Sequence, residues 1–464
     1  MDGSESHGVQ MNDWHEAEQQ VERAHEFYEA GRWDEAEAAL RMAIAVNPYQ
    51  PEWQFNLGLT LEAAGRLEDA VEAFRCCFDL SEDGDPQSAM ILGSTLIELD
   101  RSEEAIPWLE KCLELAPSNV DAHVHLIDAF ALLGRHDEAE VHFYMAVQLQ
   151  PECAPAHAAL AESLLDRQEY DRAVWCLRAA ARIDPQLPRV HARLAKACAE
   201  TGRLERARQL YLRELRRSPG DVDTIVDLGR LLMDMNRLTE AGEKLRRALE
   251  IEPDHTEAHM SLGELAQMLG DRDLARRHFD VVVRLDATYG GARRRLAEVL
   301  LAERDRGDLD RAAVLLREEA SWALHDAKNL ETDELEELLG LLMDAQLTQQ
   351  ALSISKLLVQ RRPGDASSHH QLSVAQFGLG MVAEGVASSR RALRLRPGYV
   401  APMHNLAVAH LRRGEISRAR YWVRQGLAIE PDDRGLRRLR TYLRIQTVRS
   451  FYEAFGLLVR RSRR

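Results

Sequence analysis

The chain has 464 residues, of which 45% are hydrophobic and 29% are charged, so it can bury a continuous core beneath a large charged surface. Its formal net charge of −16 argues against a nucleic-acid-binding role, because contacts with phosphates need a cationic face. No stretch approaches the roughly 20 apolar residues that span a bilayer, so no integral membrane segment is expected.

The N-terminal part of the chain is acidic. Residues 1–16 lack the basic and apolar regions of a signal peptide, and we expect them to form an acidic tail. Residues 1–120 contain 26 acidic and 7 basic residues, a net charge of 7 − 26 = −19. None of the six cysteines belongs to a CxxC pair: Cys76, Cys77, Cys112, Cys153, Cys176 and Cys198. Scattered cysteines of this kind indicate small buried side chains in a reducing compartment, and we expect a cytoplasmic location.

Prolines recur at a constant interval. Two series have a spacing of 34 residues: Pro117, Pro151, Pro185, Pro219 and Pro253, and then Pro363, Pro397 and Pro431. A fixed period of this length is typical of repeat architectures, in which each unit packs only against its neighbours.

Each unit contains two amphipathic helices joined by a turn. In residues 51–84, apolar side chains recur at helical spacing over 57–64, Gly65 marks the turn, and a second stripe covers 67–78. The turn position holds a glycine in eight units and another residue in four: Gly31, Gly65, Gly134, Gly202, Gly270, Gly307, Gly380 and Gly414, with Asp100, Gln168, Asn236 and Gln346 in the others. We expect a left-handed backbone there, which favours glycine.

Five residues beyond the turn, every unit has a very small side chain. The twelve residues are Ala36, Ala70, Ala105, Ala139, Ala173, Ala207, Ala241, Ala275, Ala312, Ala351, Gly385 and Ala419. A larger side chain would overpack a close helix crossing, so the pattern predicts that this site is buried between two helices. Four residues later a bulky residue is usual, for example Phe74, Phe143, Tyr211 and Phe279.

Taken together, this 34-residue unit resembles the tetratricopeptide repeat (TPR) family. The match includes Leu-Gly pairs in the first helix at 57–58, 92–93, 228–229 and 262–263, and it covers residues 17–433 in twelve units. The resemblance implies an all-α, right-handed superhelical solenoid of antiparallel helix pairs, with first helices lining a concave groove and a C-terminal capping helix pair. Two binding modes of the family do not carry over. The paired Lys and Asn residues of chaperone-binding members are not found, and the asparagine ladder of sugar transferases is reduced to Asn56 and Asn405.

The register breaks between Val282 and Pro363, where the closing sites Ala287 and Pro363 are 76 residues apart, eight more than two periods. Three fit a charged turn at 303–308 and five fit a linker. We therefore expect nine units over 17–326, an irregular linker at 327–331 and three units over 332–433. The linker is either a hinge between two sub-arrays or an insertion tolerated in a rigid rod, because lengthening a loop costs little.

Residues 434–464 contain ten arginines and one glutamate, a net charge of 10 − 1 = +9. Apolar stripes over 436–443 and 448–458 predict an Arg-rich helical cap, which a terminal repeat needs to cover its exposed face. The alternative is that Arg434–Arg464 contacts an anionic membrane surface or an acidic partner.

No catalytic, cofactor or metal site is predicted. Five histidines occupy one repeat position and are interpreted as packing residues: His123, His157, His191, His259 and His369. The zinc motif HExxH, the phosphate-binding motif GxxxxGK[ST] and the nucleophile motif GxSxG do not occur in the sequence.

The predicted functional surface is the concave groove, and its expected partners are protein or peptide segments. Its candidate residues come from first helices: Arg189, Lys196, Arg230, Met233, Glu257, Met260, Glu264, Met268, His370, Phe377, His404 and Arg412. The favoured function is a non-catalytic scaffold or adaptor. One alternative is the substrate-binding part of a glycosyltransferase-type or other multidomain enzyme acting in trans. The other is a peripheral assembly factor for secretion or envelope biogenesis that docks through the basic C-terminus.

Overall fold

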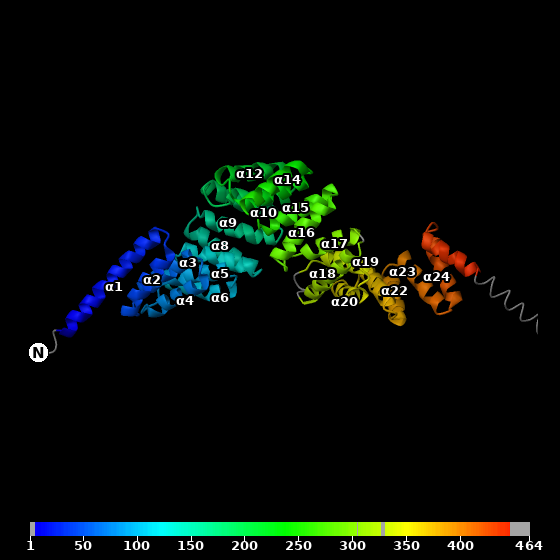
Figure 1. The fold of residues 1–464 in the computed structure, drawn as a ribbon, viewed down its shortest axis with the longest axis horizontal. Helices are drawn as coiled ribbons and strands as arrows, with labels where there is room; N and C mark the ends of the chain where they lie inside the picture. The colour runs from blue at the N-terminus through cyan, green and yellow to red at the C-terminus, as the bar shows by residue number, and fades with distance from the viewer. Residues whose placement is uncertain (1–4, 304, 326–329, 446–464) are drawn as a thin grey trace, which may run out of the picture. The chain divides into compact units, whose positions relative to one another are not determined.

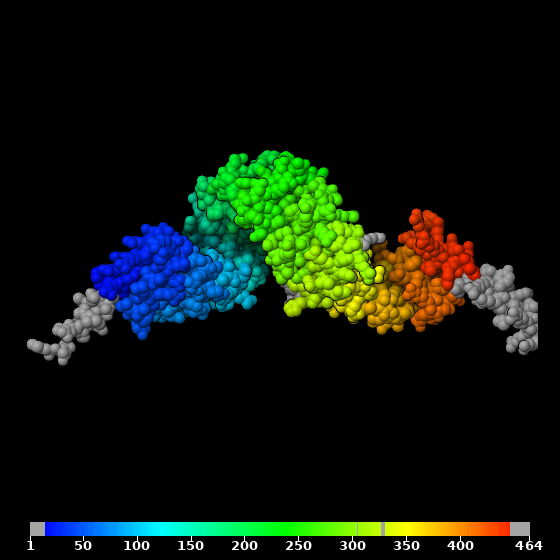
Figure 2. All heavy atoms as spheres, viewed as in Figure 1, coloured from blue at the N-terminus to red at the C-terminus, as the bar shows by residue number. Residues whose placement is uncertain are grey.

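The computed structural model describes residues 5–303, 305–325 and 330–445. Within these residues the regular structure is entirely α-helical, which confirms the predicted fold class. The chain divides into two compact units, Met1–Ile251 and Glu252–Arg464. In both, antiparallel helix pairs follow one another in chain order (Figure 1) and pack into a continuous surface (Figure 2).

The described part of the first unit consists of seven helix pairs, α1(Glu5–Glu29) with α2(Trp33–Val46), α3(Pro51–Ala63) with α4(Leu67–Leu80), α5(Pro86–Glu98) with α6(Ser102–Leu115), α7(Val120–Leu132) with α8(His136–Leu149), α9(Ala154–Asp166) with α10(Tyr170–Ile183), α11(Val190–Glu200) with α12(Leu204–Arg217), and α13(Val222–Asp234) with α14(Leu238–Ile251).

The described part of the second unit has five pairs, α15(Thr256–Leu269) with α16(Arg272–Leu285), α17(Ala292–Glu303) with α18(Arg306–His325), α19(Thr332–Asp344) with α20(Thr348–Arg361), α21(Ala366–Gly378) with α22(Val382–Leu395), and α23(Val400–Arg412) with α24(Ile416–Ile429). Residues 434–445 are also helical.

The start of helix α1 and the division between the compact units are the two boundaries to compare with the expected segments. Helix α1 begins at Glu5, inside the segment 1–16 that we expected to be a tail. From Trp14 onward this helix packs on the first repeats: the Trp14 ring lies 5.8 Å from the Trp53 ring of α3, and Ala17 is buried. The division between compact units falls after Ile251, and residues 330–331 and 332–433 belong to the same unit as α15–α18. Residues 327–329 of the expected linker, and residue 326 before it, lie outside the described residues.

The small residue of each second helix is buried, as predicted. All eleven alanines at this position have no exposed surface, and Gly385 is also buried. Gly385 is the one glycine of the series because a Cβ atom there would lie 2.6 Å from ring atoms of Phe377.

The glycine of the Leu-Gly pair has a related role, which the sequence pattern did not reveal. A Cβ atom on Gly58 would lie 2.4 Å from the Phe74 ring, and one on Gly263 would lie 2.4 Å from the Phe279 ring. In these two units the bulky residue of the second helix therefore packs against bare backbone in the first helix.

The left-handed turn is confirmed, even where glycine is replaced. Asp100, Gln168, Asn236 and Gln346 have φ angles of 59°, 60°, 57° and 58°. The predicted left-handed turn at Gly307 was wrong, because this residue lies inside α18 and has no positive φ angle. Its backbone N–H donates to the Asp305 carboxylate at 3.1 Å, so Asp305 begins the helix and no glycine turn forms.

An ion cluster holds the irregular region of the second unit together. Arg294 of α17 is 5% exposed, and its Nε atom lies 3.3 Å from Oε1 of Glu319, which is 3% exposed. The same guanidinium donates to the Glu334 carbonyl at 3.0 Å and to the Glu334 carboxylate at 2.5 Å. One arginine thus ties α17 to α18 and α19.

The first apolar stripe of the C-terminal segment covers the last helix pair. Leu436 is fully buried and Leu443 is 2% exposed. A Cβ atom on Gly426 would lie 2.4 Å from a Leu436 methyl group, so this helix packs closely on α24. The second predicted stripe, at 448–458, lies outside the described residues.

Candidate functional site

In the first unit, the first helices of the pairs form the more closely spaced layer. In the first unit α5 packs on α7, α7 on α9 and α11 on α13, and in the second α17 packs on α19 and α21 on α23. Second helices pack mainly on the first helix that follows them, and among the described helices only α18 and α20 form a comparable second-to-second pair. In a curved array the closely spaced layer lies on the inside. The first helices of the first unit therefore form the inner wall on which a partner was expected to bind.

Charged residues follow this wall in the first unit. Residues 34 apart occupy the same position on successive first helices, so Asp128, Glu162, Lys196 and Arg230 form one row across α7, α9, α11 and α13. The row is acidic at its first two positions and basic at its last two. Arg193 joins the two halves, because its Nε atom lies 3.2 Å from Glu162 Oε1.

Asp128 is the most perturbed carboxyl group on this wall. Burial raises the pKa of Asp128 to about 6, the charge of Arg193 lowers this pKa, and the charge of Glu162 raises it. Burial also lowers the pKa of the neighbouring His125. Both side chains are half-buried on α7, in a site where a cation from a partner would favour the ionised carboxylate. Neither residue was predicted from the sequence, although Asp128 occupies the same repeat position as Lys196, and His125 the same position as Arg193.

The predicted site residues of the first unit have different environments. Lys196 and Arg230 are exposed on the wall. Met233 is half-buried and packs against the core. Arg189 precedes α11 with a left-handed φ of 57°, and its Nη1 atom donates to Asp223 at 2.9 Å. Arg189 therefore links two neighbouring repeats through an ion pair.

Two predicted residues of the second unit make packing contacts, Met260 in the core and Phe377 as a half-buried ring. Met260 is 9% exposed and belongs to the core, so it is not available to a partner. Phe377 packs on Gly385 of α22, as described above. The helical period alone did not reveal that these side chains point toward neighbouring helices. The remaining candidates range from half-buried to exposed: Glu257, Glu264, Met268 and Arg412.

The last two predicted residues lie in one cleft. His370 of α21 and His404 of α23 line a space of about 420 Å³ together with Tyr399, Asn405 and Asp433. The His370 ring lies 5.2 Å from the Tyr399 ring, and burial lowers the pKa of His370. His370 Nδ1 and Asn405 Nδ2 are buried and have no hydrogen-bond partner among the described residues, and Glu430 also lines the cleft.

The five periodic histidines are packing residues in this structure. His123, His157 and His191 are buried. The Nε2 atoms of His259 and His369 lie 2.9 and 3.1 Å from the carbonyl oxygens of Pro253 and Pro363, the prolines that close the preceding units. Among the residues that the structure describes, no group of three or more His, Cys, Asp or Glu side chains is placed to hold a metal ion.

The comparisons with known proteins agree with this repeat geometry. A family model described as the cilia and flagella-associated protein 70 C-terminal domain matches residues 80–332, more than half of the chain. The chain belongs to this family. Two tetratricopeptide repeat models match residues 10–75 and 400–425, so the chain is a TPR protein over both units.

The TPR protein is also similar to solved structures of low sequence identity. One is from a study of pilF of Pseudomonas aeruginosa, with 20% identity over 46% of this chain and 97% of that chain and a TM-score of 0.40. Another is a TPR protein of Thermus thermophilus, with 23% identity over 39% and 99% and a TM-score of 0.37. A third is the human IFIT1 dimer with m7Gppp-AAAA, with 16% identity over 81% and 89% and a TM-score of 0.45. A search of curated proteins gave no significant match. None of the helices searched among the described residues is long and apolar enough to cross a membrane.

Proposed function

We propose that this TPR protein is a non-catalytic scaffold that captures segments of partner proteins along its first helices. The observation that carries the proposal is the charge-sorted row of Asp128, Glu162, Lys196 and Arg230 on four successive helices of the first unit. Such a wall is fixed before binding, so a flexible segment that docks on it loses less free energy to ordering than it would on a mobile surface.

The order of charges along this row predicts the order of charges in the partner segment. Carboxylates of the partner would lie against α11 and α13, where Lys196 is exposed and forms no ion pair with a described residue. Basic side chains would lie against α7 and α9, near Asp128 and Glu162. Complementary charges of this kind fix the direction of a bound segment and raise its association rate.

The experiment compares two variants with the same change in charge. Lys196→Glu reverses a charge on the wall, and Arg206→Glu reverses one on the exposed surface of α12. Partners captured from the native source, and a synthetic segment with separate acidic and basic halves, should bind the Lys196→Glu variant at least tenfold more weakly. Binding to the Arg206→Glu variant should be unchanged. Equal binding by both variants would show that the wall is not the binding surface.

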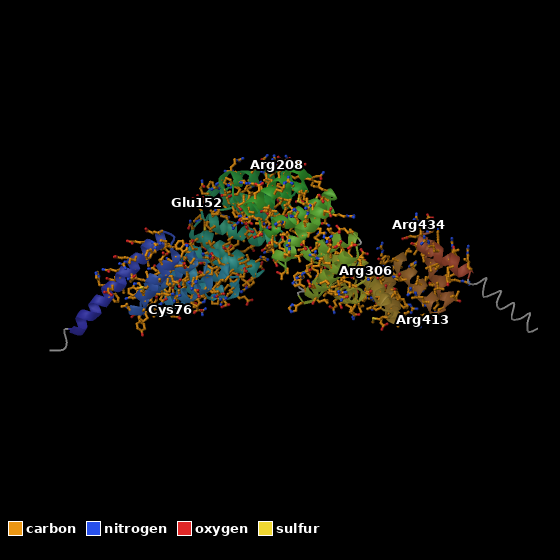
Figure 3. The ribbon with its side chains drawn as sticks, in the orientation of Figure 1. Cys76, Glu152, Arg208, Arg306, Arg413 and Arg434 are labelled. Carbon is orange, nitrogen blue, oxygen red and sulfur yellow. The ribbon has the colours of Figure 1, made fainter. Side chains whose placement is uncertain are left out.

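We further propose a cytoplasmic location. All six cysteines are free thiols, and five are buried as small apolar side chains, while Cys76 is partly exposed on α4 (Figure 3). Burial raises the pKa of Cys77 and of Cys176 to about 11, which keeps both thiols protonated and unreactive. Because the family is named for a cilia and flagella-associated protein, proteins of a ciliary or flagellar structure are the first partners to test.

A second candidate function involves the basic C-terminus. The helix at 434–445 and α24 enclose a cleft of about 820 Å³ with an apolar floor that includes Val423 and Leu443. Four arginines line it: Arg420, Arg424, Arg440 and Arg444. This arrangement favours an acidic amphipathic helix of an assembly partner. Replacing Arg424 and Arg440 by Glu should abolish binding of such a helix and leave binding at the α7–α13 wall intact.

A further inference from the structure

Helix α8 exposes an apolar stripe on the side opposite to its core contacts. Val141, Tyr144, Met145 and Leu149 are 53%, 62%, 47% and 44% exposed. Their spacing of three and four residues places them on one face, while Ala139, Phe143 and Ala146 of the same helix are buried. A helix that is apolar on both faces is usually covered on both.

The other repeats show that Tyr144, in the middle of this stripe, is unusual. The position of Tyr144, five residues beyond the small site, holds a charged residue in ten of the twelve units: Arg41, Arg75, Glu110, Arg178, Arg246, Asp280, Arg317, Lys356, Arg390 and Arg424. Leu212 occupies it in one more unit and is half-buried. The fold therefore tolerates a charge at this position, and Tyr144 is not needed for packing within the chain.

Two neighbouring helices extend the apolar surface. Leu115 of α6 and Trp175 of α10 are 41% and 63% exposed. Trp175 occupies the same repeat position as Val141, and Leu115 the same position as Leu149. We call these two residues and the four of α8 the α8 patch. Exposed apolar residues gathered over three successive helices are typical of a protein–protein interface.

The margins of the α8 patch carry opposite charges. On the α6 side Glu110 and Glu114 are exposed, and at the same two repeat positions on the α10 side Arg178 and Arg182 are exposed. None of these four side chains forms an ion pair with another described residue. Lys111 of α6 is engaged elsewhere, because its Nζ atom lies 4.4 Å from the centre of the Phe78 ring.

This distribution is self-complementary. When two copies of a surface meet face to face about a two-fold axis parallel to α8, the α6 side of each copy lies opposite the α10 side of the other. The acidic margin of each copy then meets the basic margin of its partner, and the two apolar stripes meet in the middle. An axis perpendicular to α8 would instead place glutamates against glutamates.

We infer that the α8 patch is the interface of a homodimer, in which two α8 helices pack in parallel about a two-fold axis. Symmetric dimers of this kind use the same patch on both subunits. The interface leaves the α7–α13 wall of both copies accessible, because it lies on the second helices.

The first test uses a residue that the other repeats already contain. Sedimentation equilibrium of the full chain should show a dimer, and Tyr144→Arg should raise its dissociation constant by about 100-fold, because each substitution acts twice in a symmetric interface. Far-ultraviolet circular dichroism should show unchanged helix content. Lys356→Tyr, the reverse change at the same position of α20, serves as the control and should leave the dimer unaffected.

The second test uses the charges alone and does not disturb the apolar stripe. Glu110→Arg and Arg178→Glu should each weaken the homodimer, because each places like charges opposite one another. An equimolar mixture of the two variants should form a heterodimer, since every facing pair is then of opposite sign. A monomeric wild type at high micromolar concentration, or a mixture that stays monomeric, would overturn the inference. So would a wild-type dimer that Tyr144→Arg does not weaken.

Discussion

His123 Nδ1 lies 3.0 Å from His142 Nδ1, and the same contact recurs four repeats later, where His259 Nδ1 lies 3.0 Å from His278 Nδ1. Each contact joins the first and second helix of one unit. Because a hydrogen bond between two ring nitrogens needs one donor and one acceptor, each pair can carry at most one proton on these two atoms, and the acceptor ring must be neutral.

These pairs predict a loss of stability in acid. Burial, together with the neighbouring histidine, lowers the pKa of His142 and of His278 to about 4. An unfolded histidine has a pKa near 6.5, so between pH 6.5 and 4 the unfolded state binds more protons and stability falls as the pH falls. After discounting for partial exposure, we expect each pair to lower the free energy of unfolding by about 1–2 kcal/mol over this range.

The measurement is thermal unfolding from pH 7 to pH 4.5 for the wild type and for His142→Gln with His278→Gln. Glutamine keeps a hydrogen-bonding group but cannot be protonated in this range. The wild type should therefore lose more stability than the variant. Asp128 is common to both proteins and acts in the opposite direction, because its raised pKa favours the folded state as the pH falls toward 4. Identical pH profiles would contradict the role of the pairs.

The packing of Phe74 on Gly58 predicts that Gly58→Ala destabilises the protein. The added methyl group would lie 2.4 Å from the Phe74 ring, and overpacking of this kind costs about 1–3 kcal/mol. The matched control is Gly340→Ala, at an exposed position of α19, where the added methyl group meets nothing within 4 Å. This change should stabilise the helix by about 0.5–1 kcal/mol. Chemical denaturation of both variants checks the contrast, and equal effects would disprove the close approach.

The left-handed turns predict stabilising substitutions. Gln168 and Gln346 have φ angles of 60° and 58°, a conformation that costs residues with a side chain about 1 kcal/mol relative to glycine. Gln168→Gly and Gln346→Gly should each raise the free energy of unfolding by up to about 1 kcal/mol. Gly65→Ala, at φ 74° with no atom within 4 Å of the added carbon, should lower it through backbone strain alone. A destabilised Gln168→Gly variant would count against this account.

Because Arg294 and Glu319 form a buried pair, we predict that substitutions of the two residues have strongly non-additive effects on the free energy of unfolding. Burial raises the pKa of Glu319, while the charges of Arg294 and Arg293 lower it. Arg294→Met removes the closest cation and leaves a buried carboxylate poorly compensated, which should cost about 3–5 kcal/mol. Combining it with Glu319→Leu should recover much of that loss. Additive effects in the double variant, measured by denaturant unfolding, would show that the two groups are not coupled.

The sequence predicted features that depend on contacts within one repeat. The 34-residue period identified helix pairs, the small residue between them and the left-handed turn, because each of these is determined by residues close in the chain. The same reasoning failed at Gly307, where an Asp305 cap begins a helix at the expected turn. It also did not anticipate that Gly58 is needed to accommodate Phe74.

The tertiary structure decided which face of a helix meets solvent, the groove or the next repeat. Helical spacing placed Met260, Phe377 and Lys196 alike on the groove face. In the structure Met260 and Phe377 pack on neighbouring helices, whereas Lys196 is exposed. The apolar stripe of α8 was not predicted from the sequence, and only the packing shows that it is uncovered. The physical reason is that a periodic pattern fixes the angle between side chains around a helix, whereas the crossing of helices determines which of those angles are buried.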